Sequence, residues 1–255
     1  LKIRTATSSF NTHADYVAEM ARQLMFAQYG PEIYTRGLNV YTTVRASDQQ
    51  AAYFALRRGI MDFERRQHYR GPERFISLPT KPAELEDAID DALIEQGDKG
   101  DLLAAVVLEA TPKKVRVMRQ NSEVLEITGD GLQPVQSGLS DKAAPNIKLR
   151  PGALVRITKT AKGGWEITQL PEVEGAFVSI DPRDGAIHAL VGGFDFNKNK
   201  FNHVTQAWRQ PGSSFKPFIY SAALEKGFTP MTVVNDAPLF FDASVTGGQP
   251  WEPKN

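Results

Sequence analysis

The stretch Arg209-Gln-Pro-Gly-Ser-Ser-Phe-Lys216 places a serine and a lysine three positions apart, Ser213 and Lys216, at the start of a run typical of a helix. That run covers residues 217–226 and is stopped by Gly227. A serine just ahead of a helix has its hydroxyl and its N–H at the positive end of the helix dipole. A lysine three residues on lies one turn along the same face. The pattern favours a nucleophilic serine activated by a neighbouring amine.

The flanks of this tetrapeptide are more informative than its spacing, because Ser-x-x-Lys occurs by chance about once in a chain of this length and composition. Residues 201–220, Phe-Asn-His-Val-Thr-Gln-Ala-Trp-Arg-Gln-Pro-Gly-Ser-Ser-Phe-Lys-Pro-Phe-Ile-Tyr, closely resemble the active-site segment of bifunctional class A penicillin-binding proteins of type 1a. In that family the serine of Ser-x-x-Lys attacks the D-Ala-D-Ala end of a peptidoglycan stem peptide. Penicillin-binding proteins also carry a Ser-x-Asn-type motif and Lys-Thr-Gly.

The resemblance implies a multidomain α+β protein. We expect residues 1–100 to form an interdomain linker of helices and a strand, residues 101–175 an OB-like β-barrel, and residues 176–255 the N-terminal part of a β-lactamase-like transpeptidase domain. The chain begins at Leu1 rather than Met and ends at Asn255 without a closing element. In the family, a membrane anchor and a glycosyltransferase domain would precede this chain, and the rest of the transpeptidase domain would follow it. The location implied is the periplasmic side of the bacterial inner membrane.

The resemblance also implies the chemistry of a serine-type D-Ala-D-Ala transpeptidase or carboxypeptidase. Neutral Lys216 takes the proton of Ser213, whose Oγ attacks the penultimate D-Ala carbonyl. D-Ala leaves, and an amine of a second stem peptide resolves the acyl-enzyme. The N–H of Ser213 would supply half of the oxyanion hole. β-Lactam antibiotics would acylate Ser213 as mimics of the same peptide.

Two family motifs do not occur in their expected places. Ser9-Phe-Asn11 has the Ser-x-Asn spacing but lies far upstream of the nucleophile, in the wrong order. Lys159-Thr160 is followed by Ala161 rather than Gly, inside a predicted strand. We interpret both as chance matches, which leaves the second oxyanion donor missing as well. The 255-residue chain alone is therefore expected to be inactive.

Composition excludes several other classes of function. Thirty basic residues balance thirty acidic ones, so no charge excess points to nucleic acid. The absence of cysteine excludes disulfides and thiolate metal sites. Four scattered histidines give no metal-ligand spacing, and we expect no cofactor. No apolar run of about eighteen residues occurs, so no segment is expected to cross a bilayer, and no signal peptide is present.

The first part of the chain has a helical pattern followed by a strand pattern. Residues 11–30 predict a helix that Asn11 or Thr12 would cap and Gly30 would end. Residues 37–44 alternate apolar and polar side chains and are rich in β-branched ones, which predicts a strand.

Two more helices are predicted before residue 100. Ser47 with Gln50 reads as a capping box. The helix it opens would carry an apolar stripe of Ala52, Ala55, Leu56, Gly59, Ile60 and Phe63. Residues 82–96 form an acidic helix with proline in its first turn, and Lys99-Gly-Asp101 marks a boundary. This succession of helix, strand and helix resembles the family's linker.

Beyond that boundary the period changes to that of strands, and five short strands within about seventy residues suit a small OB-type barrel. OB barrels that bind single-stranded nucleic acid use basic grooves and stacking aromatics. This segment has mixed charge and one aromatic residue, Trp165, so binding of nucleic acid is disfavoured. The family resemblance implies instead an OB-like domain inserted before the transpeptidase, with a docking surface for a protein partner. The predicted strands are residues 102–109, 114–118, 123–127, 153–160 and 165–169.

A hairpin is predicted over residues 175–193, where two alternating strands flank Asp181-Pro-Arg-Asp-Gly185. It resembles the opening strands of the transpeptidase sheet. His188 lies in the second strand, where a structural role is favoured over a catalytic one. Residues 236–253 read as irregular.

Three hypotheses compete for the function. The first is a class A transpeptidase fragment that carries the nucleophile. The second is a non-catalytic interaction or regulatory module of the same cell-wall synthase, in which the linker and OB domain matter and Ser213 is incidental. The third is a stand-alone Ser-Lys hydrolase such as a β-lactamase, which the two hundred residues ahead of the serine disfavour.

Overall fold

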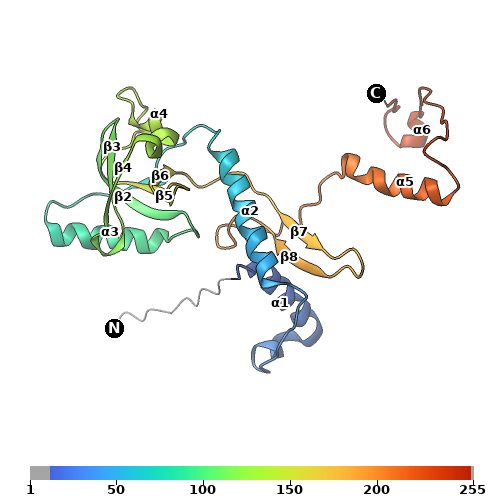
Figure 1. The fold of residues 1–255 in the computed structure, drawn as a ribbon, viewed down its shortest axis with the longest axis horizontal. Helices are drawn as coiled ribbons and strands as arrows, with labels where there is room; N and C mark the ends of the chain where they lie inside the picture. Colours follow the sequence, from blue (N-terminus) through green and yellow to red (C-terminus); the bar gives the residue numbers. More distant parts are fainter. Residues whose placement is uncertain (1–11, 254–255) are drawn as a thin grey trace. The chain divides into compact units, whose positions relative to one another are not determined.

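The computed structural model describes residues 12–253 and divides into two compact units, Leu1–Ala207 and Trp208–Asn255 (Figure 1). The protein is of the α+β class, and all its strand ladders within the described residues are antiparallel. The first unit contains a six-stranded sheet and a separate two-stranded hairpin. None of the helices within residues 12–253 is long and apolar enough to cross a membrane.

Three long helices belong to the first unit: α1 (Asp15–Tyr29), α2 (Ala46–Glu64) and α3 (Pro82–Gln96). Gly30 and Gly97 end α1 and α3 with φ of 62°, a left-handed conformation that glycine adopts without strain. The helices confirm the predicted patterns, but the predicted caps are wrong. The N-caps are Ala14 for α1 and Arg45 for α2, and neither makes a side-chain capping bond.

The first turn of α2 explains the capping error. The helix begins at Ala46, with Arg45 as its N-cap, so Ser47 lies inside the helix and cannot be its N-cap. Its hydroxyl donates to the Asp48 carboxylate at 3.1 Å. Thr12 does not cap α1, whose N-cap lies two residues later, and Asn11 lies outside the described residues.

The predicted strand over residues 37–44 is wrong. A 3-10 turn, η1 (Gly30–Tyr34), leads into a segment without a ladder. Only its end reaches the hairpin, where the Thr43 hydroxyl donates to the Ile187 carbonyl at 2.7 Å and the Arg45 N–H donates to the His188 carbonyl at 2.9 Å. The alternating pattern instead turns Leu38 and Val40 toward a groove beside α1. Alternation fixes which side chains share a face, but a strand also needs a backbone partner.

The strands of the main sheet are β1 (Arg74–Phe75), β2 (Leu103–Ala110), β3 (Lys114–Met118), β4 (Val124–Thr128), β5 (Ala153–Lys159) and β6 (Trp165–Thr168). The sheet is organised around β5. One edge of β5 pairs with β2, and the other pairs with β1 at its start and with β6 at its end. β3 and β4 continue the sheet beyond β2. The five predicted strands are confirmed to within one or two residues.

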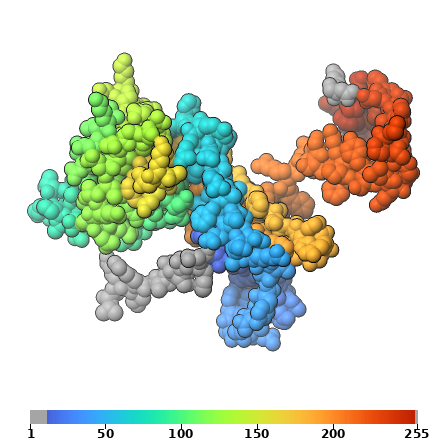
Figure 2. Space-filling model, in the orientation of Figure 1, coloured from blue at the N-terminus to red at the C-terminus, as the bar shows by residue number. Residues whose placement is uncertain are grey.

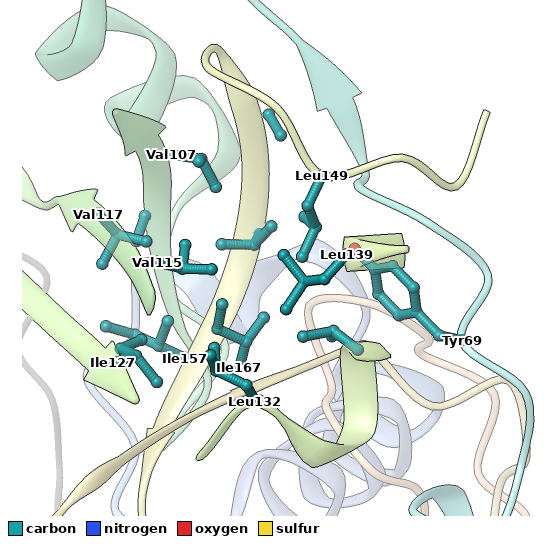
Figure 3. Packing of buried hydrophobic residues seen from close by; sticks show 14 residues of the cluster. Tyr69, Val107, Val115, Val117, Ile127, Leu132, Leu139, Leu149, Ile157 and Ile167 are labelled. Carbon is teal, nitrogen blue, oxygen red and sulfur yellow. The ribbon is translucent and has the colours of Figure 1, made fainter. Parts of the chain in front are cut away.

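The strands do not close into a hydrogen-bonded barrel within the described residues, because the edge strand β4 has no ladder with β6. The 3-10 segment η3 (Gly129–Val135) packs across β6 instead. Figure 3 shows Leu132 of η3 directed at Ile127, Ile157 and Ile167. Side chains rather than backbone bonds therefore fill the gap between these two strands.

Alternate residues of β2 are buried on opposite faces of the sheet. Ala105 and Val107 point into the larger core, whose members are drawn in Figure 3. Ala104 and Val106 point the other way and pack under α3. This two-sided burial explains why β2 is a nearly continuous apolar run. The second face is covered by Ile89 and Leu93 of α3, with Met118 and the partly buried Ile76, Leu78, Leu85 and Leu108.

The predicted hairpin is confirmed as β7 (Phe177–Ile180) and β8 (Ile187–Val191). Its turn closes through a 2.9 Å bond from the Gly185 N–H to the Asp181 carbonyl, with Gly185 at φ 77°. α2 lies along the hairpin, where Ala52 packs against Ala189 and Val191.

The other end of α2 reaches the main sheet, where the end of the helix meets β6 in Figure 2. Arg65 pairs with Glu166 at 2.9 Å, and the Gln169 amide donates to Glu64 at 2.7 Å. One helix thus contacts both sheets of the first unit.

The second unit contains η4 (Gly212–Phe215), α5 (Lys216–Glu225) and α6 (Ala243–Thr246). Gly227, at φ 85°, ends α5 with the next N–H, that of Phe228, donating to Ala223 at 3.0 Å. The stretch that was predicted to be irregular contains the short α6, capped by Asp242, and a two-bond bridge between Phe241 and Trp251.

Candidate active site

Ser213 and Lys216 lie on one turn at the junction of two helical segments. Ser213 is the second residue of η4, and Lys216 is the first residue of α5. The Lys216 N–H donates a hydrogen bond to the Ser213 carbonyl. In a 3-10 turn, side chains at i and i+3 eclipse. The junction therefore projects the hydroxyl and the amine from the same side of the chain, as the spacing predicted.

The Pro-Gly dipeptide ahead of the serine shapes this turn. Gly212 has φ of 52°, which residues with a side chain rarely adopt. The Ser214 N–H donates to the Pro211 carbonyl at 3.1 Å and closes the turn around Gly212. The sequence Pro-Gly-Ser-Ser thus sets the direction from which the chain enters the helix, and with it the position of Ser213.

The electrostatics of the junction come from the backbone. The Ser213 N–H lies in the first turn of η4, where a helix provides no acceptor of its own. α5 continues for ten residues and directs its positive end toward the same place. An oxyanion placed there would meet an unpaired N–H and a favourable dipole.

Both candidate side chains are exposed. In the part of the chain that the structure describes, no side-chain hydrogen bond joins the Ser213 hydroxyl to the Lys216 amine. The structure therefore brings the two residues onto one turn and leaves the contact between their functional groups unmade. Catalytic hydrogen bonds often shorten only when substrate is bound.

The helix that follows is apolar on all sides. Phe218, Ile219, Tyr220 and Leu224 all have large exposed areas. A helix without a polar face is typical of the interior of a domain. The sequence around the nucleophile is therefore that of a core helix.

The loop that leads toward this segment is anchored within the first unit by residues that the sequence did not single out. The Tyr16 hydroxyl donates to the Asn199 carbonyl at 2.7 Å, and burial, followed by the charge of Glu174, raises the pKa of Tyr16. Asn202 is buried and accepts from the Val204 N–H at 3.0 Å. The signal available for Asn202 was its place inside the stretch that carries the family resemblance.

A pair of glycines makes this anchoring possible. A Cβ on Gly192 would lie 2.5 Å from the Asn202 side chain and 2.7 Å from the Tyr16 ring, and one on Gly193 would lie 2.3 Å from the Tyr16 hydroxyl. Glu174 accepts from the Phe194 N–H at 2.9 Å just after these glycines. The start of the loop is therefore packed tightly against α1.

The two chance motifs lie elsewhere. Lys159 ends β5, with its ammonium 5.4 Å from the centre of the Trp165 ring. Thr160 closes the β5–β6 turn through a 2.9 Å bond to the Gly164 carbonyl. Ser9 and Asn11 lie outside the described residues. Within residues 12–253, no cluster of three or more histidine or acidic side chains has the geometry of a metal site.

Two family models match adjacent parts of the chain. The model described as "Penicillin-binding protein OB-like domain" matches residues 69–173. The model described as "Penicillin binding protein transpeptidase domain" matches residues 175–255. The six-stranded sheet falls within the first match. The hairpin and the Ser213 turn fall within the second.

Individual proteins agree with these matches. The chain is 42% identical over 241 residues to penicillin-binding protein 1A of Neisseria meningitidis serogroup A, covering 94% of this chain and 30% of that protein. It is 39% identical over 249 residues to penicillin-binding protein 1A of Pseudomonas aeruginosa, covering 95% and 30% respectively. The crystal structure of penicillin-binding protein 1A from Haemophilus influenzae matches with a TM-score of 0.79 and 34% identity, over 100% of this chain and 37% of that one. The chain thus spans about a third of the length of its relatives.

Proposed function

Because the chain belongs to the class A penicillin-binding proteins of type 1A, we propose that it carries the acylating serine of a peptidoglycan D,D-transpeptidase. The observation that carries this proposal is the turn that places Ser213 and Lys216 at the start of α5, inside the match to the transpeptidase domain. The substrates are the D-Ala-D-Ala stem peptides of the cell wall, and the location is the periplasmic side of the inner membrane.

In the proposed reaction, the neutral amine of Lys216 accepts the proton of the Ser213 hydroxyl. Ser213 Oγ forms a bond to the carbonyl carbon of the penultimate D-Ala. The bond from that carbon to the terminal D-Ala nitrogen breaks, and the nitrogen leaves with a proton. An amine of a second stem peptide then attacks the ester and releases Ser213. Attack by water instead gives carboxypeptidase activity.

The backbone supports the charge that develops in this reaction. The Ser213 N–H is one donor to the oxyanion, and the dipole of α5 adds to it. β-Lactams present a reactive carbonyl in the same place and would leave a stable ester on Ser213. We therefore propose that penicillin also acylates Ser213.

The Ser213 assignment is tested with a fluorescent penicillin on the longer protein that carries this chain. Ser213→Ala should abolish labelling, whereas Ser214→Ala, which changes the neighbouring exposed serine of η4, should retain it. Labelling of Ser213→Ala at the wild-type level would overturn the assignment.

The role of Lys216 is tested by the rate of acylation. Lys216→Ala should slow it by about a hundredfold or more, because the serine loses its base. Lys226→Ala, at the other end of α5, is the matched control and should acylate at the wild-type rate. Rates within a few-fold of each other for the two variants would show that Lys216 is not the base.

The isolated 255-residue chain should react poorly with penicillin. Ser213 and Lys216 are exposed in it, and the sequence has no Lys-Thr-Gly. Loss of one oxyanion donor alone typically costs about a hundred- to a thousandfold in rate. Rapid stoichiometric acylation of the isolated chain would contradict this.

The OB-like region has a separate role in the proposal. We infer that its sheet and η3 together form an OB-like barrel, supported by the match over residues 69–173 and by the packing of Leu132 across the gap. The fold suits a docking surface for a protein partner. The second candidate function, a non-catalytic interaction module, is favoured by the exposure of Ser213. It predicts that Ser213→Ala leaves transpeptidation by the longer protein unchanged.

A further inference from the structure

The turn over residues 97–102 is held from two sides by fully buried arginines. It follows α3, leads into β2, and contains Gly97 and Gly100 at φ of 62° and 65°. Arg57 of α2 and Arg156 of β5 are 2% and 1% exposed and both donate to its carbonyl oxygens. A buried guanidinium is tolerated only where its donors are satisfied, so each contact is tightly specified.

Arg57 connects three segments that are distant in the sequence. Its Nη2 donates to the Lys99 carbonyl at 2.8 Å, and its Nε donates to the Asp101 carboxylate at 2.9 Å. Its Nη1 donates to the Phe194 carbonyl at 2.8 Å, and its guanidinium carbon lies 3.9 Å from the centre of the Phe194 ring. One side chain on α2 therefore binds both the turn and the residues that follow the hairpin.

Arg156 ties the same turn to the main sheet. Its Nη1 donates to the Gly97 carbonyl at 2.6 Å. Its Nε and Nη2 donate to the two oxygens of the Glu73 carboxylate at 2.6 and 3.0 Å. Asp98 adds a bond from within the turn, because its carboxylate accepts from the Ala104 N–H of β2 at 2.8 Å. Hydrogen bonds from Arg156 and Asp98 thus attach the turn to the main sheet.

Apolar packing also joins the turn to α2 and to Phe194. Leu102, at the end of the turn, is fully buried in one cluster with Phe194 and with Ile60 and Met61 of α2. A Cβ on Gly100 would lie 2.9 Å from the Tyr53 hydroxyl and 3.1 Å from Nη2 of Arg57. A side chain at this position would therefore displace Tyr53 or Arg57, in addition to straining the backbone at φ 65°.

We propose that the 97–102 turn is a coupling joint that makes the OB-like sheet and the α2–hairpin assembly open as one cooperative body. Arg57 is the link on the hairpin side, and Arg156 is the link on the sheet side. The joint goes beyond the proposed function, because it concerns how a force or a partner acting on the OB-like sheet reaches the first strands of the transpeptidase region.

The test is hydrogen–deuterium exchange, read by mass spectrometry, on the 255-residue chain. In Arg57→Met, amides of β8 and Phe194 should exchange at least about tenfold faster than in the wild type, while amides of β3 keep their wild-type rates. Arg58→Met removes the same charge from the neighbouring exposed position of α2 and should change neither set. Equal acceleration in both segments, or no acceleration in either, would overturn the proposal.

A second pair of variants serves if Arg57→Met does not fold. Gly100→Ala should loosen the joint from the turn side and speed exchange in β8 in the same selective way. Gly163→Ala is its matched control, since Gly163 also has a positive φ, 82°, but has open space around its Cβ position. Faster amide exchange in β8 of Gly163→Ala, or unchanged exchange in β8 of Gly100→Ala, would contradict the proposed coupling through the turn.

Discussion

The side-chain amide of Gln49 makes with the backbone of Leu190 the pair of hydrogen bonds that a neighbouring strand would make. Its Nε2 donates to the Leu190 carbonyl at 2.9 Å, and its Oε1 accepts from the Leu190 N–H at 2.8 Å. The same Nε2 also donates to the His13 carbonyl at 2.9 Å. Gln49 is fully buried, so a helix side chain completes the edge of β8.

Replacement of Gln49 by leucine should therefore destabilise the chain. Leucine cannot make the two hydrogen bonds to Leu190, so the N–H and C=O of Leu190 remain buried without partners. Each unsatisfied group typically costs about 1–3 kcal/mol of stability. We expect a loss of about 2–5 kcal/mol in the free energy of unfolding measured with urea. Gln50→Leu, one residue on and exposed, should change it by less than about 0.5 kcal/mol. Equal effects of the two substitutions would refute the strand-substitute role.

Gly131 and Gly59 should respond to alanine in opposite directions. A Cβ on Gly131 would lie 2.1 Å from the Trp165 carbonyl oxygen, so η3 would have to move away from β6. Such overpacking typically costs about 1–3 kcal/mol. Gly59 lies inside α2 with open space around its Cβ position, and alanine there should stabilise by about 0.5–1 kcal/mol. Urea unfolding of both variants checks this, and a tolerated Gly131→Ala would contradict the packing of η3.

Asp181 gives the hairpin a dependence on pH. Hydrogen bonds from the Arg183 side chain, at 2.7 and 3.0 Å, and from the Arg183 N–H, at 3.0 Å, lower the pKa of Asp181 from 3.8 to about 2. Because the folded pKa is depressed, the stabilisation is present above pH 3.8 and is lost as pH falls toward 2.

Arg183→Ala should raise the pKa of Asp181 toward its ordinary value, as measured by NMR titration of the carboxyl carbon. Arg116→Ala, in β3 of the other sheet, is the control and should leave that pKa unchanged. An Asp181 pKa that stays near 2 in Arg183→Ala would show that the arginine is not the cause.

The OB-like unit should need residues ahead of its predicted boundary at residue 101. Without residues 69–97 the sheet loses α3 from its second face, and Arg156 loses Glu73. A polypeptide of residues 69–175 should unfold in one cooperative thermal transition, and one of residues 98–175 should be much less stable. Equal melting temperatures for the two would contradict this.

The sequence predicted most helices and strands correctly, because the spacing of apolar residues and the glycines at element ends depend only on neighbouring residues. The acidic helix over residues 82–96, the five strands and the hairpin all followed from apolar spacing and from glycine at their ends. The segment over residues 37–44 failed because a strand depends on a distant partner, which a local pattern does not reveal. The caps failed because the exact first residue of each helix was misplaced: α1 has Ala14 and α2 has Arg45 as its N-cap.

The site was predicted only in its local part. The turn that joins Ser213 to Lys216 is set by four consecutive residues and so was readable from the sequence. The contacts of Tyr16, Gln49 and Arg57 join residues separated by 36 to 183 positions. No pattern in a single sequence indicates which polar residue of a helix will be buried against a distant backbone.

We propose that Ser213 is the nucleophile of a penicillin-binding enzyme. The most direct measurement is peptide mapping by mass spectrometry after the longer protein that carries this chain has reacted with benzylpenicillin. We expect one stoichiometric penicilloyl adduct, located on Ser213 and absent from Ser213→Ala. An adduct on another residue, or one that persists in Ser213→Ala, would contradict it.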